Sequence, residues 1–260
     1  MSPSGTRGAQ EERRQTIVDH VLAHGSASAA DLAELTGVSL MTVHRDLDEL
    51  ERRGVVRKFR GGVSALPSTV FESNLEYRLG RHGPEKEALA RAALPLVEPG
   101  MSVMLDDSTT VLALARLLTE VLPLTVVTNS RRVVDVFAGV DQARLICLGG
   151  EYSRTHDSYL GVPCTEAIEA LSVDMVIVST SAMDAGMTYH QEQDIVLVKR
   201  AMLASGQRKV LLMDHSKLPR TALHRLAPVQ AYDHLVIDSS VPDEIAADLR
   251  ERTEVRVART

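Results

Sequence analysis

Short apolar runs alternate with amphipathic stretches after Gly100, and this alternation limits the fold more than any other feature of the sequence. Helical stretches of about ten residues separate several of the runs, as in chains that build parallel sheets from strand–helix–strand units. The runs predicted to be buried strands are Met101–Leu105, Leu124–Thr128, Arg144–Leu148, Met175–Ser179, Val210–Met213 and Leu235–Ile237. The helices expected between them are Val111–Val121, Arg131–Ala138, Cys164–Leu171 and Ile195–Ser205. The pattern predicts an open, mostly parallel α/β sheet with right-handed crossovers.

Polar residues and glycines follow the ends of these strands. Ligands of open α/β sheets bind beyond the carboxyl ends of the strands, and a helix N-terminus flanked by hydroxyl groups suits a phosphate. Any one of these residues alone is more often a cap or a turn, but several such loops at one edge favour a small, polyhydroxylated, anionic ligand. The residues predicted to contact this effector are Asp106, Ser108, Thr109, Thr110, Asn129, Ser130, Gly150, Arg154 and Lys217.

The first sixty residues have a different pattern, with three helical stretches followed by two β-prone runs. Ser28 and Asp31 form a capping-box pattern at the second helix, and Ser39 is placed to cap the third. In the third helix the apolar residues predicted to face inward are Leu40, Val43, Leu47 and Leu50. The runs Val55–Phe59 and Val63–Leu66 are joined by Gly61-Gly62, which indicates a hairpin. This order predicts a winged helix-turn-helix.

Charge on this part is concentrated where a winged helix-turn-helix would meet DNA. Residues 1–66 hold nine basic and nine acidic side chains, yet five basic residues and no acidic one lie between Arg52 and Arg60. A recognition helix contacts bases mainly through its N-terminal turns, and a basic wing contacts phosphates. The residues predicted to bind DNA are Ser39, Met41, Thr42, His44, Arg45, Arg57, Lys58 and Arg60, with Arg45 as the candidate for a guanine contact. A helical mini-domain that binds another protein is the competing interpretation.

The stretch from Ser39 to Val63 resembles the N-terminal signature of the DeoR family of bacterial regulators. The matching residues are Val38-Ser39, Thr42-Val43, Arg45-Asp46-Leu47, Leu50, Gly54 and Gly61-Gly62-Val63. His44 and Phe59-Arg60 depart from the usual pattern. Residues from about Glu85 to Asp238 also resemble the DeoR sensor domain, whose motifs D-x-G-T-T, T-N-S, G-G and D-x-S-K are matched here except that Ser108 replaces the glycine. The resemblance implies a fold related to ribose-5-phosphate isomerase and a sugar-phosphate effector that is bound without turnover.

The domain organisation expected from these patterns is a DNA-binding domain at 1–66, a linker at 67–83 and an effector-sensing and oligomerisation domain at 84–260. The two cysteines, Cys147 and Cys164, lack zinc-type spacing and are expected to be reduced. Since no signal peptide or membrane-spanning run is present, the expected location is the cytoplasm. The net charge of −6 argues against indiscriminate nucleic-acid binding.

The function expected is a sequence-specific transcriptional regulator, a repressor of a sugar-catabolism operon that a phosphorylated sugar releases from its double-stranded DNA operator. A homo-oligomer is expected because one copy would bind DNA weakly. No nucleotide-binding motif is present, so no cofactor is expected. No metal is expected either, and the run Tyr189–Asp194 is interpreted as a solvated loop. The alternative is a sugar-phosphate isomerase with an appended DNA-binding domain, in which Asp106 or Asp107 would act with Lys217.

Overall fold

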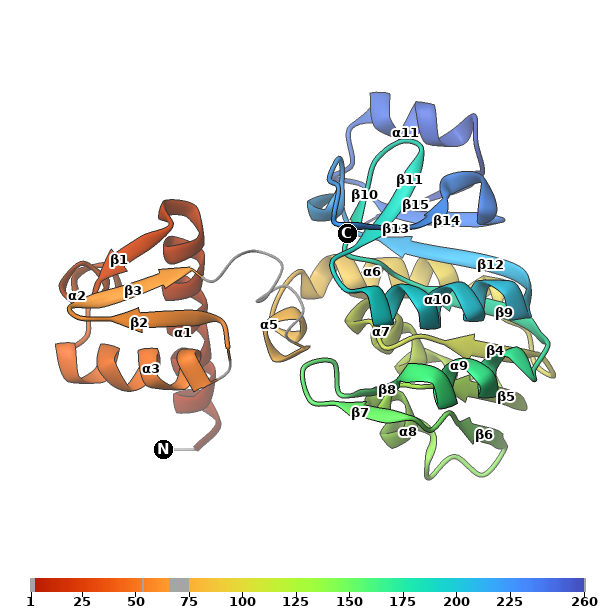
Figure 1. The fold of residues 1–260 in the computed structure, drawn as a ribbon, viewed down its shortest axis with the longest axis horizontal. Coiled ribbons are helices and arrows are strands. Elements are labelled where there is room, and N and C mark those ends of the chain that lie inside the picture. The colour runs from red at the N-terminus through yellow and green to blue at the C-terminus, as the bar shows by residue number, and fades with distance from the viewer. Residues whose placement is uncertain (1–2, 53, 66–74, 260) are drawn as a thin grey trace. The chain divides into compact units, whose positions relative to one another are not determined.

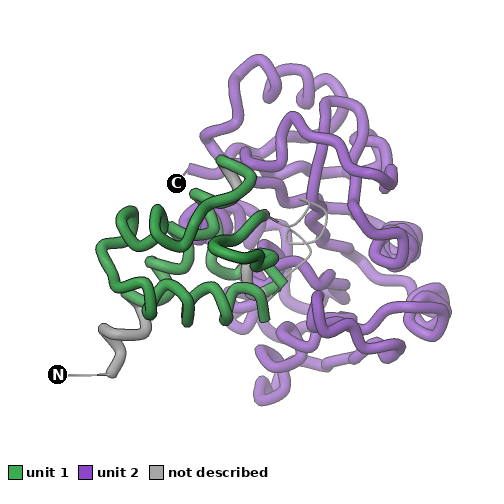
Figure 2. Tube along the Cα trace, turned by 60° about the vertical axis from the view of Figure 1, so that its left-hand side comes forward, with its two compact units in different colours: residues 1–81 green, residues 82–260 purple. Residues whose placement is uncertain are grey.

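The computed structural model describes residues 3–52, 54–65 and 75–259, and the chain divides into two compact units, residues 1–81 and 82–260 (Figures 1 and 2). The predicted boundary at residues 66 and 67 lies outside the described residues. Within the segment expected to be a linker, α5 (Leu75–Leu79) forms a short helix that belongs to the first unit.

The first unit is a winged helix-turn-helix, as predicted. Its hairpin gains a third strand that the sequence analysis missed, because β1 pairs with β3 in a sheet of order β1-β3-β2. The close approach of β1 explains the second wing glycine, since a Cβ on Gly62 would lie 2.4 Å from the carbonyl oxygen of Ala27. In chain order the elements are α1 (Pro3–His24), β1 (Ser26–Ser28), α2 (Ala29–Thr36), α3 (Leu40–Arg52), β2 (Val56–Phe59) and β3 (Gly62–Ala65).

Local signals at the helix ends form as the sequence predicts. The Ser28 hydroxyl accepts a hydrogen bond from the backbone N–H of Asp31 at 3.1 Å, and the Asp31 carboxylate accepts one from the backbone N–H of Ser28, which completes the capping box. Ser39 accepts a hydrogen bond from the backbone N–H of Thr42 through its side chain and so caps α3. These caps fix where the second and third helices begin.

The inner face of α3 packs into the core of the first unit. Val43, Leu47 and Leu50 are buried against Ile17 of α1 and other apolar side chains. Leu40 was expected to join them, but it is 51% exposed. Side chains on a helix tilt toward its N-terminus, so the side chain of this first residue extends past the core rather than into it.

The second unit is built on a seven-stranded, wholly parallel sheet of order β15-β14-β12-β9-β4-β5-β6. Six of its strands lie at the predicted runs, and the edge strand β15 was not predicted. The strands are β4 (Ser102–Leu105), β5 (Leu124–Thr128), β6 (Ala143–Cys147), β9 (Val173–Val178), β12 (Gly206–Met213), β14 (His234–Asp238) and β15 (Glu254–Ala258).

Helices cover the sheet, so the strands are buried as their continuous apolar sequences require. Figure 1 shows α10 and α9 in front of the strands, with α6 and α7 behind them. The helices are α6 (Gly83–Ala93), α7 (Thr109–Leu118), α8 (Arg131–Phe137), α9 (Gly161–Glu169), α10 (Gln193–Ser205) and α11 (Asp243–Arg250). Single-turn 3₁₀ helices lie at Leu94–Leu96 (η1), His215–Lys217 (η2) and Val229–Ala231 (η3).

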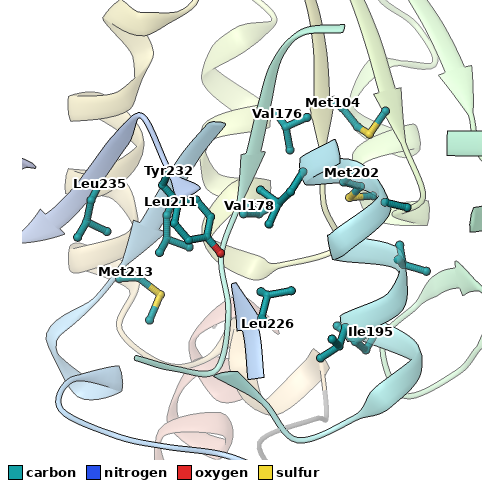
Figure 3. Packing of buried hydrophobic residues seen from close by; sticks show 14 of the residues in the cluster. Met104, Val176, Val178, Ile195, Met202, Leu211, Met213, Leu226, Tyr232 and Leu235 are labelled. Carbon is teal, nitrogen blue, oxygen red and sulfur yellow. The ribbon is translucent and has the colours of Figure 1, made fainter. Parts of the chain in front are cut away.

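A large apolar cluster lies between the sheet and α10. Figure 3 shows Ile195 and Met202 of α10 facing Val176 and Val178 of β9, with Leu226 beside them. Burying an aliphatic side chain of this size contributes about 1.5–3 kcal/mol. Packing on this scale holds the backbone of α10 in place over the strands.

Two small antiparallel pieces were not predicted. The hairpin β7 (Glu151–Ser153) and β8 (Ser158–Leu160) follows the third sheet strand. A three-stranded sheet of order β10-β11-β13 lies between β9 and β14 in the sequence. Its strands are β10 (Ala182–Met183), β11 (Met187–His190) and β13 (His224–Pro228).

The start of the β7–β8 hairpin leaves no room for a side chain at Gly150. Gly150 has a φ of +144°, and a Cβ there would lie 2.3 Å from the carbonyl oxygen of Leu160 and 3.0 Å from the Cβ of Cys164. The neighbouring Gly149 has no atom within 4 Å of such a Cβ.

We therefore expect Gly150→Ala to lower the free energy of unfolding by roughly 2–4 kcal/mol, through backbone strain and overpacking. Gly149→Ala is the matched control and should change stability little. Urea unfolding of both variants, followed by circular dichroism, measures the difference. Equal stabilities would show that the hairpin does not press on residue 150.

Candidate DNA-binding face and candidate effector site

The outer face of α3 carries the side chains predicted to contact bases. Met41 is 70% exposed, and His44 and Arg45 are exposed beside it, while the opposite side of the helix is core. Ser39 is exposed and Thr42 half-buried, and their hydroxyl oxygens lie 3.0 Å apart at the start of the helix. The structure thus brings the predicted base-reading residues onto one solvent-facing surface.

The wing adds cations on β2 and at its turn. Arg57 and Arg60 are exposed. Like Arg45, they form no ion pair with any residue that the structure describes, so their charges are available to phosphates. Lys58 differs from them because it is half-buried and forms an ion pair with Asp48 of α3.

Asp46 has a role that the sequence analysis missed. Its carboxylate is fully buried and accepts hydrogen bonds from Nε of Arg13 at 2.7 Å and from Nε of Arg14 at 2.9 Å. Both arginines are on α1, so this charged group joins α1 to the recognition helix. The available signal was its spacing, since residue 46 lies within the inward stripe between Val43 and Leu50.

The residues predicted to bind an effector gather mainly at the carboxyl edge of the parallel sheet. The loop after β4 opens α7, where Ser108 accepts a hydrogen bond from the backbone N–H of Val111 at 3.1 Å. Ser130 after β5 caps α8 in the same way. Buried side chains at this edge include Asp106, Ser108, Thr109, Thr110, Asn129 and Ser130.

Asp106 is saturated by protein donors. One carboxylate oxygen accepts hydrogen bonds from the backbone N–H of Ser108 at 3.0 Å and from its hydroxyl at 2.6 Å. The other accepts one from the backbone N–H of Ser179 at 2.9 Å and an ion-paired one from Lys199. This carboxylate therefore fixes the ends of β4 and β9 relative to α10.

Lys199 was not identified from the sequence. It lies on α10, is 3% exposed, and also forms an ion pair of 3.4 Å with Asp107. Asp107, a candidate catalytic carboxylate in the isomerase alternative, is also buried and accepts a hydrogen bond from the hydroxyl of Ser158 at 2.8 Å. Burial of two neighbouring carboxylates requires a cation between them, and Lys199 supplies it.

Three buried polar atoms at this edge accept no hydrogen bond within the described part of the chain. They are Oγ1 of Thr110, Oδ1 of Asn129 and Oδ2 of Asp214, although the last lies at ion-pair distance, 3.4 Å, from Nζ of Lys217. Leaving such an atom unsatisfied costs about 1–3 kcal/mol. Buried polar atoms of this kind, close to a helix N-terminus, are typical of a site that a polar ligand completes.

Lys217 lies in η2, just after β12, and contacts the residues that follow β9 and β12. Its ammonium donates a hydrogen bond to the hydroxyl of Ser179 at 3.0 Å and lies 3.4 Å from Oδ2 of Asp214. Burial alone would raise the pKa of Asp214. The charge of Lys217, a hydrogen bond from Ser216, and the charges of His82 and Lys86 outweigh burial and lower this pKa to about 2. Asp214 is thus an anion that holds Lys217 at the sheet edge.

Arg154 is placed differently from the other predicted effector residues. It is exposed in the turn of the β7–β8 hairpin. The hairpin itself is fastened by Asp157, whose carboxylate accepts hydrogen bonds of 2.6 Å from Arg131 and from the hydroxyl of Tyr152. Burial raises the pKa of Asp157, but the hydrogen bonds from Arg131, Tyr152 and Arg132 outweigh it and hold this pKa below its ordinary value.

The run from Tyr189 to Asp194 is not simply a solvated loop. His190 is the buried end of β11, and its Nδ1 accepts a hydrogen bond from the backbone N–H of Glu192 at 3.1 Å. The Glu192 carboxylate lies 2.9 Å from Nε2 of His156. Among the described residues no group of three or more His, Cys, Asp or Glu side chains is arranged to hold a metal ion.

No helix in the described ranges is long and apolar enough to cross a membrane.

Replacing Lys199 tests the buried ion cluster. Lys199→Met leaves Asp106 and Asp107 buried without a cation, and we expect it to cost about 3–5 kcal/mol of unfolding free energy. Lys209→Met is the control, because Lys209 is half-buried and its ammonium forms no ion pair with a described residue. Chemical denaturation at neutral pH compares the two. Wild-type stability in Lys199→Met would mean that the two carboxylates do not depend on this cation.

Family models match both units of the chain. The model of the DeoR-like helix-turn-helix domain matches residues 13–69, and that of the DeoR C terminal sensor domain matches residues 81–239. The chain is 32% identical over 251 residues to the HTH-type transcriptional repressor GlcR of Bacillus subtilis (strain 168), covering 95% of each protein. It is 28% identical over 234 residues to the glycerol-3-phosphate regulon repressor of Escherichia coli (strain K12), covering 90% of this chain and 92% of that protein.

Among solved structures, ribose 5-phosphate isomerase A from Neisseria gonorrhoeae aligns with a TM-score of 0.38 and 14% identity over 55% of this chain and 54% of that chain. The two family models together cover the winged helix-turn-helix and most of the parallel-sheet unit, and the matched relatives extend over nearly the whole sequence. The chain therefore belongs to the DeoR family of DNA-binding transcriptional regulators.

Proposed function

We propose that this regulator is a repressor of a sugar-catabolism operon, and that a small phosphorylated sugar binds at the carboxyl edge of the sheet and releases it from DNA. The observation that supports DNA binding is the exposed face of α3 that carries Met41, His44 and Arg45, opposite the side of the helix that packs into the core. Effector binding is supported by buried polar atoms of Thr110 and Asn129 that have no hydrogen-bond partner among the described residues.

The DNA contacts follow from the chemistry of the exposed side chains. Arg45 projects from the second turn of α3, where a guanidinium can make two hydrogen bonds to guanine in the major groove. Arg57 and Arg60 on the wing are suited to phosphates. One such unit binds weakly, so we propose a homodimer, or a higher oligomer, assembled through residues 84–260 and bound to paired half-sites.

The effector contacts follow from the polar groups at the sheet edge. The N-terminus of α7 presents backbone N–H groups that attract an anion, and Lys217 provides a cation. Thr110 and Asn129 offer a hydroxyl and an amide oxygen for sugar hydroxyl groups. The name of one relative, the glycerol-3-phosphate regulon repressor, supports a small phosphorylated compound.

Binding without turnover is supported by the state of the carboxylates. An isomerase needs a carboxylate that is free to move a proton between adjacent carbons. Asp106 accepts four hydrogen bonds from described residues, two at each carboxylate oxygen, and Asp107 is bound to Ser158 and Lys199. Incubation with pentose and hexose phosphates, followed by chromatography, tests this directly, since aldose–ketose conversion at enzyme-like rates would establish the isomerase instead.

Release from DNA requires only that the effector prefers one state of the protein. A ligand that binds the DNA-incompetent state more tightly by about 1–3 kcal/mol lowers DNA affinity by roughly 5- to 150-fold. The segment joining the two units is the connection through which we propose that this preference reaches the wing and α3.

The first test concerns base reading. We expect Arg45→Ala to reduce the preference for operator over unrelated DNA, with a loss of about 1–3 kcal/mol at one base pair, because a bidentate contact is removed. Arg57→Ala is the comparison and should weaken binding to all sequences alike. Binding to an operator selected from random duplexes and to its single-base variants measures the preference. Unchanged discrimination in Arg45→Ala would show that α3 is not the reading helix.

The second test concerns the effector. Lys217→Ala should leave operator affinity intact and shift the release of DNA to effector concentrations at least tenfold higher, because the cation of the site is lost. Lys209→Ala, away from the sheet edge, controls for a change of net charge. Titration of the protein–operator complex with sugar phosphates, read by fluorescence anisotropy, gives both values. An identical titration curve for Lys217→Ala and the wild type would remove this lysine from the site.

A further inference from the structure

Lys58 faces the interior side of the wing, whereas its neighbours face outward. Successive side chains of a β-strand point to opposite faces. Val56 is fully buried, and Lys58, two residues on, is only 27% exposed by its side chain. Arg57 and Phe59, on the other face of β2, are both exposed. The alternation therefore separates Lys58 from Arg57, while Arg60 lies beyond the end of β2, where it is exposed in the turn.

Two acidic residues of α3 hold Lys58 at both its backbone and its side chain. Its ammonium forms an ion pair with Asp48, and its backbone N–H donates a hydrogen bond of 2.8 Å to Oε1 of Glu51. We call these three residues, Asp48, Glu51 and Lys58, the helix–wing clamp. The clamp joins the C-terminal half of the recognition helix to β2.

We propose that Lys58 stays in the clamp when the protein binds DNA, so that it positions the wing relative to α3 and does not contact a phosphate. The proposal rests on the DNA-binding function proposed above and refines its contact list. It assigns the phosphate contacts of the wing to Arg57 and Arg60 alone.

The position of Asp48 explains why a clamp is needed there. Asp48 is three residues after Arg45, one turn along the same side of α3, and its side chain is 65% exposed. An unpaired carboxylate at this position would repel the phosphates that flank the groove. Lys58 neutralises it, and the pair as a whole contributes no net charge to the DNA-facing surface.

A surface ion pair of this kind adds little to folding stability, so the expected effects appear in DNA binding. The logarithm of the binding constant falls linearly with the logarithm of salt concentration, with a slope of about −0.9 for each phosphate that the protein neutralises. The slope therefore counts phosphate contacts, and a residue that only positions the wing does not change that count.

The decisive variant is the charge-conserving double substitution Asp48→Asn with Lys58→Gln. We expect it to keep the wild-type salt slope and to lose several-fold in the ratio of operator to unrelated DNA affinity, because the wing is no longer fixed. Lys58→Arg should retain both the slope and the ratio, since it preserves the ion pair. Arg57→Gln is the reference and should make the slope less negative by about 0.9.

The experiment uses the full-length protein, a selected operator duplex and a mixed-sequence duplex, over a series of KCl concentrations. Circular dichroism melting confirms that each variant is folded. If the double variant loses about 0.9 of slope, as Arg57→Gln does, Lys58 contacts a phosphate and the proposal is wrong. If Arg57→Gln leaves the salt slope unchanged, the proposed DNA-binding face is wrong, and the clamp proposal that rests on it is wrong as well.

Discussion

The ion cluster of Lys199 with Asp106 and Asp107 is the interaction on which the sensor unit depends. Its members come from α10 and from the end of β4, and their hydrogen bonds reach Ser179 after β9 and Ser158 in β8. Charges buried this deeply are tolerated only when each is paired and hydrogen-bonded. The requirement sets the positions of the strand ends, and those ends form the candidate effector site.

The DNA-binding unit also contains a buried carboxylate that is paired with basic side chains. Asp46 is buried with Arg13 and Arg14 around it, and it ties α1 to α3. Pairing these charges internally divides the basic residues of the unit into two groups. Some arginines and Lys58 hold the domain together, while Arg45, Arg57 and Arg60 form no ion pair with the described residues and remain available to DNA. Neutral net charge over residues 1–66 is therefore compatible with a cationic binding face.

Features that depend on local sequence were predicted well. The apolar runs place six strands of the sheet, and the capping residues Ser28 and Ser39 mark the starts of helices. The short strands of the β7–β8 hairpin were missed, since a run of three residues such as Glu151–Ser153 is too short to show a strand pattern in the sequence. Lys199 was missed although it lies four residues after Ile195 and three before Met202 in the buried stripe of α10. A charged residue inside such a stripe indicates a buried partner, but the sequence does not say which carboxylate it meets.

The arrangement of charges at the sheet edge also limits where an anion can bind. Asp106, Asp107 and Lys199 together carry one net negative charge, so an anionic group is repelled from that side and attracted to Lys217 and to the N-terminus of α7. Lys217 is already paired with Asp214, so an anion that binds there competes with that carboxylate for the positive charge of Lys217. Asp214 is also stabilised as an anion by His82 and Lys86, which lie at the start of the sensor unit and of α6. Any anion bound at Lys217 thus acts electrostatically on the residues that immediately follow the DNA-binding unit in the chain.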